Sequence, residues 1–120
     1  MDELRDRYAR QIGERSPDGA EVWLNWMVRR RDTGELIGTV QATVNGVAAE
    51  LAWVIAVHHQ RRGYAREAAG AVQGRLRDDG VTRFSAHIHP EHAASAGVAR
   101  AIGLAPTGTV VDGEIRWTDD

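Results

Sequence analysis

The stretch QRRGYA, residues 60–65, decides how the rest of the chain is interpreted. It follows an apolar run, residues 51–57, and precedes a segment with helical spacing. A strand that enters a short glycine turn and opens a helix directs several backbone N–H groups, and the positive end of the helix dipole, at one spot. Gly63 lets the backbone approach a ligand closely, and Arg61 and Arg62 add permanent positive charge. The stretch therefore predicts a phosphate-binding turn, although an ordinary surface turn has a similar sequence.

Length and composition indicate one globular domain. The chain has 120 residues, 42% of them hydrophobic, and a formal net charge of −2. This balance argues against disorder and against a general surface for nucleic acid. The absence of cysteine excludes disulfides, thiolate metal sites and a cysteine nucleophile. The acidic N-terminal residues do not resemble a signal peptide, and Glu50 interrupts the longest apolar run. We expect a soluble, cytoplasmic, single-domain protein over residues 1–120, with no nucleic acid or membrane partner.

The first half of the chain predicts one helix and three antiparallel strands. Leu4, Tyr8 and Ile12 recur every four residues, which predicts a helix over residues 2–15. Short turn signals then separate three strand patterns. The expected strands are 22–30, 36–44 and 47–57. The last of them is almost wholly apolar, as expected of a central strand buried on both faces.

The segment after the glycine turn predicts a parallel strand pair. An amphipathic helix runs from Tyr64 to a stop at Asp79-Gly80, and a strand over residues 83–89 follows it. A strand-helix-strand unit places its two strands parallel through a right-handed crossover. The fold class is therefore α/β with a mixed sheet.

The last third predicts a second helix and a hairpin. Pro90 is expected to start the helix and Gly103 to end it, with Pro106 just beyond. The residues expected on its inner face are Ala94, Val98, Ala101 and Ile102. Residues 109–111 and 114–118 flank an Asp-Gly turn and are typical of a hairpin.

The chain resembles the GNAT superfamily of acetyl-CoA-dependent N-acetyltransferases. Residues 60–65 match the family's pyrophosphate loop, Q/R-x-x-G-x-G/A. Residues 89–104, HPEHAASAGVARAIGL, are similar to the family's P-x-N-x-x-S segment, helix and G-F. The match is closest to the branch that includes ribosomal-protein N-terminal acetyltransferases, and it covers about residues 36–106. The resemblance implies a mostly antiparallel central sheet with one parallel, splayed strand pair, flanked by helices.

The resemblance also implies acetyl-CoA as the acyl donor and a primary amine as the acceptor. Backbone N–H groups of the glycine turn would hold the pyrophosphate, and the splay would expose strand edges to the pantetheine amides. The residues assigned to coenzyme A in this way are Ile55, Val57, Gln60, Arg61, Arg62, Gly63, Tyr64, Ala65, His92 and Ser95.

Two residues are the candidates for catalysis. Glu50 is the only charged residue in the apolar strand, and burial would make its carboxylate a better base. The alternative is that Glu50 lies where the strand emerges into water. Ser95 occupies the position at which the related branch has a serine proposed to assist the leaving thiolate. Its alternative is a small helix residue packed near a ligand or facing solvent.

Departures from the family pattern leave two functional classes open. The family's general-acid tyrosine corresponds to Ala99, its motif asparagine corresponds to His92, and the N-terminal part is shorter than usual. The chain is expected to be an active N-acetyltransferase; the alternative is a non-catalytic acyl-CoA-binding or regulatory module. Trp23, Trp26 and Met27 place large apolar groups on both faces of one strand, from which we expect a homodimer.

Two histidines are candidate metal ligands. His87 and His89 lie on one face of an expected strand, which suits two ligands of one ion. No third ligand is fixed by that strand, so we expect no metal site.

Overall fold

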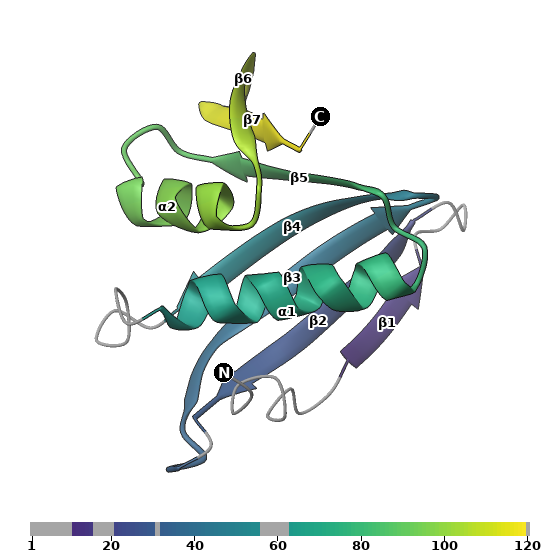
Figure 1. Ribbon diagram of the computed structural model, residues 1–120, viewed down its shortest axis with the longest axis vertical. Helices are drawn as coiled ribbons and strands as arrows, with labels where there is room; N and C mark the ends of the chain where they lie inside the picture. The colour runs from purple at the N-terminus through teal and green to yellow at the C-terminus, as the bar shows by residue number, and fades with distance from the viewer. Residues whose placement is uncertain (1–10, 16–20, 31, 56–62, 120) are drawn as a thin grey trace.

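The computed structural model describes residues 11–15, 21–30, 32–55 and 63–119, which form one mixed sheet and two helices (Figure 1). In chain order the elements are β1 (Gln11–Arg15), β2 (Val22–Arg29), β3 (Leu36–Asn45), β4 (Ala48–Ile55), α1 (Tyr64–Asp78), β5 (Arg83–Ile88), α2 (Ala93–Ala101), β6 (Ala105–Val111) and β7 (Glu114–Thr118). The strands are ordered β1-β2-β3-β4-β5-β7-β6 across the sheet. Neither helix of this described part has both the length and the apolar character that crossing a bilayer requires.

The antiparallel half of the sheet confirms the predicted strands. β2 pairs with β3 and β3 with β4, and Val40 lies opposite both Trp26 and Trp53. The turn between β3 and β4 consists of Gly46 and Val47, between the paired residues Asn45 and Ala48, and Gly46 has the positive φ (61°) that a tight hairpin needs. Local turn chemistry therefore sets the register of these strands, as the sequence predicted.

The helix predicted over residues 2–15 is wrong where the structure describes it, because β1 is a strand paired with β2. Ile12 lies opposite Asn25, and Gly13 lies opposite Leu24. A spacing of four residues keeps side chains on one face of a strand as well as of a helix, so the pattern did not discriminate between the two. Gly13 also disfavours a helix interior. Leu4 and Tyr8 lie outside the described residues.

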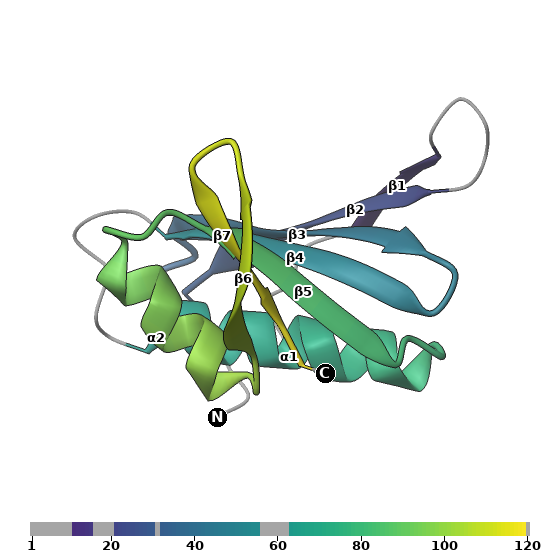
Figure 2. The same ribbon diagram turned by 90° about the horizontal axis from the view of Figure 1, so that it is seen from above.

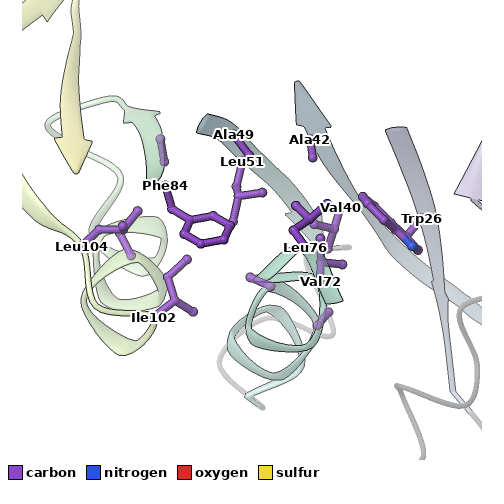
Figure 3. Close-up of a cluster of buried hydrophobic side chains, with 14 of the residues drawn as sticks. Trp26, Val40, Ala42, Ala49, Leu51, Val72, Leu76, Phe84, Ile102 and Leu104 are labelled. Carbon is purple, nitrogen blue, oxygen red and sulfur yellow. The ribbon is translucent and has the colours of Figure 1, made fainter. Parts of the chain in front are cut away.

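Both helices pack on the same face of the sheet (Figure 2). Val72 and Leu76 of α1 point toward Val40 and Trp26, and Phe84 lies between the two helices (Figure 3). All five side chains are buried. The core is thus a single layer between the helices and one sheet face.

One-sided coverage corrects the expectation that the central strand is buried on both faces. In β4, Ala49 and Leu51 are buried, whereas Glu50, Ala52 and Val54 are exposed. Small or β-branched apolar residues are tolerated on an exposed strand face, so an apolar run alone did not reveal which face the helices cover. Residues 56 and 57 of the expected strand lie outside the described part.

The parallel strand pair and the terminal hairpin are confirmed. α1 connects β4 to β5, which are parallel, and β7 pairs antiparallel with both β5 and β6. The turn between β6 and β7 has positive φ at Asp112 (51°) and Gly113 (81°), as in tight two-residue hairpins. Pro106 lies within β6, opposite Trp117, rather than merely beyond a helix end.

Helix α2 differs from the prediction in its start and its inner face. It begins at Ala93 rather than Pro90, because residues 89–92 form a turn in which the His92 N–H donates to the His89 carbonyl at 2.9 Å. Its buried residues are Ser95 and Ala99, with Ile102 just after the helix, whereas Ala94 and Ala101 are exposed. The helix is therefore turned by about one residue relative to the prediction, because its packing against the sheet, which the local pattern does not contain, sets the inner face; of the predicted residues, Ile102 is buried.

The predicted end of α2 at Gly103 is confirmed. Gly103 has a φ of 90°; its N–H donates to the Arg100 carbonyl, and the Leu104 N–H donates to the Ala99 carbonyl at 2.9 Å. This is the Schellman pattern of helix termination. A buried amide then joins the two helices, because Gln73 Nε2 of α1 donates to the Ile102 carbonyl at 2.9 Å.

The burial of Phe84 predicts a large loss of stability on truncation. Phe84 is 2% exposed and lies in the core between the two helices (Figure 3). Phe84→Ala is therefore expected to lower the free energy of unfolding by about 3–5 kcal/mol. Val47→Ala removes an apolar side chain that is 53% exposed and should change it by less than about 0.5 kcal/mol. Urea denaturation measures both; equal effects would contradict the packing described here.

Candidate functional site

The site is formed where the two parallel strands separate. β4 and β5 are joined by three residue pairs, the last of which is Glu50 with Ser85. Beyond that pair the strands diverge toward their C-terminal ends, close to the start of α1 (Figure 1). Divergence removes the ladder partners of the facing backbone groups, which become available to a ligand.

A pocket of about 240 Å³ lies in this divergence. It is lined by residues of β4, of β5, of the start of α2 and of β7. These residues are Leu51, Ala52, Trp53, Ala86, His87, Ile88, His89, His92, Ser95 and Glu114. Apolar groups from the strands are thus combined with histidines, a hydroxyl and a carboxylate, a composition typical of small-molecule sites.

Two of the predicted site residues lie in the pocket wall. His92 is the residue that precedes α2, and Ser95 lies in its first turn. Ser95 is 8% exposed, so its hydroxyl faces the interior. The packing of α2 against the sheet buries Ser95 and Ala99, and this brings the serine into the pocket wall.

Glu50 lies beside the pocket and is not one of its lining residues. Its side chain is 49% exposed, on the sheet face away from the helices, so the burial on which its assignment as a base rested is absent. The carboxylate instead accepts from a neighbour: Glu50 Oε2 lies 3.0 Å from His87 Nδ1. Glu50 is exposed because its face of the sheet is open; its strand does not emerge into water at this point, since β4 continues to Ile55.

His87 joins Glu50 to the pocket, a role that the sequence did not indicate. Ser85 is paired with Glu50, so His87, two residues further along β5, lies on the same face and within reach of the carboxylate. Its side chain is 22% exposed, less than half the fraction of Glu50. The alternation of β5 placed the two residues on one face, but the sequence alone did not give the register between β4 and β5.

Charged groups of both signs surround this pair. Arg116 of β7 is directly opposite His87, and Glu114 enters the pocket wall from the same strand. The pocket rim on this side therefore holds two carboxylates, one guanidinium and the imidazole. A protonated amine would meet negative charge there, partly offset by Arg116.

The start of α1 has the backbone geometry expected of the glycine turn. Gly63 precedes the helix with φ 83°, and its carbonyl accepts from the Glu67 N–H at 3.0 Å. Tyr64 and Ala65 begin the first turn, where the backbone N–H groups of a helix point away from its body, toward the end at which the helix dipole is positive. These groups fit an anionic ligand such as a diphosphate.

The other predicted coenzyme A residues are placed only in part. Val57, Gln60, Arg61 and Arg62 lie outside the described residues. The backbone of Ile55 ends β4 opposite Gly38. The strand residues that line the pocket, Leu51 to Trp53, were not singled out from the sequence, because the point of divergence depends on tertiary pairing.

His87 and His89 both line the pocket, but His87 is engaged with Glu50 and His89 Nδ1 accepts from the Glu91 N–H at 3.2 Å. Within the described ranges, no three histidine, aspartate or glutamate side chains are grouped so as to hold a metal ion.

Comparison with known proteins identifies the family. Residues 1–105 match the family model described as an acetyltransferase (GNAT) domain, and the chain therefore belongs to the GNAT acetyltransferase family. Among curated protein sequences, none matches this chain.

Solved structures share the fold. A GNAT-family acetyltransferase from Bacillus anthracis is 23% identical with a TM-score of 0.71, over 78% of this chain and 64% of that one. A candidate ribosomal-protein-serine acetyltransferase from Vibrio cholerae is 24% identical, with a TM-score of 0.65, over 80% and 63% of the two chains. The microcin C7 self-immunity acetyltransferase, solved with acetyl-CoA and AMP, is 16% identical, with a TM-score of 0.68, over 80% and 59%. This chain thus spans about three fifths of the length of these structures.

The left-handed backbone at Gly63 predicts a conformational cost for any side chain. Gly63→Ala should lower the free energy of unfolding by about 1–2 kcal/mol, since a Cβ there meets only Arg66 Nη2 at 3.7 Å and the cost is backbone strain. Gly74→Ala, inside α1 with nothing within 4 Å of the added Cβ, should raise it by roughly 0.5–1 kcal/mol. Thermal and urea unfolding of the matched pair measure this difference, and the same sign for both variants would refute the assigned backbone.

Proposed function

We propose that the protein transfers the acetyl group of acetyl-CoA to a primary amine of a small molecule, a peptide or a protein N-terminus. The observation that carries the proposal is the pocket at the divergence of β4 and β5, with His92 and Ser95 in its wall, in a chain of the GNAT family. The reaction is assigned to the cytoplasm.

Coenzyme A would bind at two sites, the start of α1 and the backbone of β4. The N–H groups at the start of α1, with Arg61 and Arg62, would hold the pyrophosphate. Backbone groups of β4 beyond Glu50, Ile55 among them, would receive the pantetheine amides, together with Val57, which lies outside the described residues. When bound, acetyl-CoA supplies an activated acyl thioester, and the chain's part is to hold it in line with the amine and to manage protons.

Ser95 and Glu50 would both assist the chemistry, Ser95 directly and Glu50 through a neighbouring side chain. Ser95, buried in the pocket wall, would donate a hydrogen bond to the leaving sulfur. Glu50 would act on the acceptor side, from the opposite face of the sheet. The tyrosine common in the family has no counterpart, because the corresponding position in α2 is Ala99, whose side chain is fully buried.

The buried Ala99 also favours a second candidate function, a non-catalytic acyl-CoA-binding or regulatory module. With no phenol to protonate the thiolate, such a module would bind coenzyme A and leave the amine unacetylated. The two candidates share the cofactor site and differ only in turnover.

Titration calorimetry with acetyl-CoA, followed by thiol release over a panel of amines, tests both candidates. We expect binding with turnover. Gly63→Glu should abolish binding, because the carboxylate fills the turn and repels phosphate, whereas Gly63→Ala, with the same backbone strain and no charge, should weaken it less. Binding without release of thiol selects the regulatory module, and unchanged binding by Gly63→Glu eliminates the loop assignment.

We also propose that the protein is a homodimer. Trp23 (40% exposed) and Val54 (67% exposed) project from β2 and β4 on the face away from the helices, which supports an apolar contact surface. Light scattering at micromolar concentration should give twice the 13.2 kDa mass of the chain. A mass equal to one chain contradicts the dimer, and Val54→Glu should reduce the mass if this surface is the interface.

A further inference from the structure

The hydrogen bond between Glu50 and His87 fixes where the imidazole proton lies. A carboxylate accepts hydrogen bonds and cannot donate, so His87 Nδ1, 3.0 Å from Glu50 Oε2, is the donor. In a neutral imidazole the other nitrogen, Nε2, is then unprotonated and holds a free lone pair. Within the described part of the chain, the His87 ring makes no second hydrogen bond.

The pair is oriented with the histidine toward the pocket. His87 lines the pocket, and Glu50 does not. A substrate nitrogen in the pocket would therefore meet the imidazole, with the carboxylate behind it.

Groups on three strands face this imidazole. Glu50 comes from β4, Ser85 from β5 itself, and Arg116 and Glu114 from β7, while His89 follows at the end of β5. Glu50 and Glu114 stabilise an imidazolium once it forms, and Arg116 opposes it. The direct hydrogen bond makes Glu50 the strongest of these influences.

We propose that His87 is the catalytic base of this site and that Glu50 is its positioning residue, an inference that rests on the acetyl transfer proposed above. His87 Nε2 takes the proton from the acceptor nitrogen as that nitrogen forms its bond to the acetyl carbon. The carbon–sulfur bond breaks with its electron pair going to sulfur, which is then protonated; one proton is released overall when the acceptor starts as an ammonium. The imidazole lines the pocket with a free Nε2 lone pair and is placed to accept that proton, whereas the Glu50 carboxylate is not part of the pocket lining.

The proposal places proton acceptance and thiolate assistance on different walls. His87 approaches from β5, and Ser95 approaches from α2. An acceptor nitrogen and a leaving sulfur can then be served at once without competing for one side chain.

A double-mutant cycle of His87→Gln and Glu50→Gln tests the dyad. With the proposed base removed, His87→Gln should lower kcat/KM by roughly 10²–10⁴-fold, and Glu50→Gln by roughly 10–10³-fold, with KM for acetyl-CoA unchanged in both. The double variant should be no worse than His87→Gln, because the two residues act in series. Asp79→Asn, which removes a carboxylate 61% exposed at the far end of α1, is the matched control and should retain full activity.

The pH profile adds a readout that a structural role would not change. A base that has already been protonated cannot accept the acceptor's proton, so a role of His87 as the base predicts that log kcat/KM falls as pH is lowered. In His87→Gln this fall should be shallower, since one titrating group has been removed. An equal slope, or a Glu50→Gln defect larger than that of His87→Gln, overturns the assignment of His87.

Nitrogen NMR of the imidazole ring gives a readout independent of turnover. In the parent protein His87 should show the Nδ1–H form, and Glu50→Gln should weaken that preference. A predominant Nε2–H form overturns the proposal. If the parent binds acetyl-CoA but acetylates no amine, the proposed function fails and this role with it; if it acetylates amines and His87→Gln does so equally well, only this inference fails.

Discussion

Three residue pairs hold β4 to β5, and this short parallel contact determines the shape of the molecule. Parallel neighbours require a crossover, so α1 must pass across the sheet, where it buries Val72 and Leu76. Because the contact is short, the strands separate, and different helices pack on them: α1 packs on β4, and α2 packs on β5. The pocket therefore depends on the same packing that stabilises the fold.

Because the helices cover only one face of the sheet, alternate residues of each strand are either buried under the helices or exposed on the opposite face. Along β4 and β5 one set of alternate residues, with Leu51 and Phe84 in it, makes the core. The other set, with Glu50 and His87 in it, is on the opposite face and is available for chemistry. At the divergence a substrate can meet groups of both faces, because the sheet no longer separates them. Ser95 reaches this point from the helix side, and His87 reaches it from the strand side.

The parts of the fold that depend on neighbouring residues could be predicted from the sequence. The Asn-Gly hairpin before β4, the Schellman glycine at Gly103 and the strand-helix-strand crossover are local or follow from chirality. The strand β1 could not be predicted. The four-residue spacing of apolar residues that ends at Ile12 suits a helix as well as one face of a strand, and the pairing with β2, which makes this segment a strand, is a tertiary contact.

The site was predictable to the extent that it follows a linear motif. His92 and Ser95 belong to one short segment and were assigned to the site together. The exposure of Glu50 and its bond to His87 depend on which face the helices cover and on the register of two strands that are 28 or more residues apart in sequence, from Ile55 to Arg83. The secondary-structure propensity and the hydrophobicity of a segment determine neither the covered face nor the register.

The strand order has a consequence for the growing chain. β5 lies between β4 and β7, so one of its edges receives its partner only when the last hairpin has been made. Until residues 114–118 leave the ribosome, that edge presents unpaired backbone beside Phe84, Ala86 and Ile88, a template on which another nascent chain can pair. The interval is brief, since about thirty residues at roughly 5–20 residues per second take only a few seconds. The final hairpin thus protects the protein from self-association during synthesis, in addition to contributing Glu114 to the pocket wall.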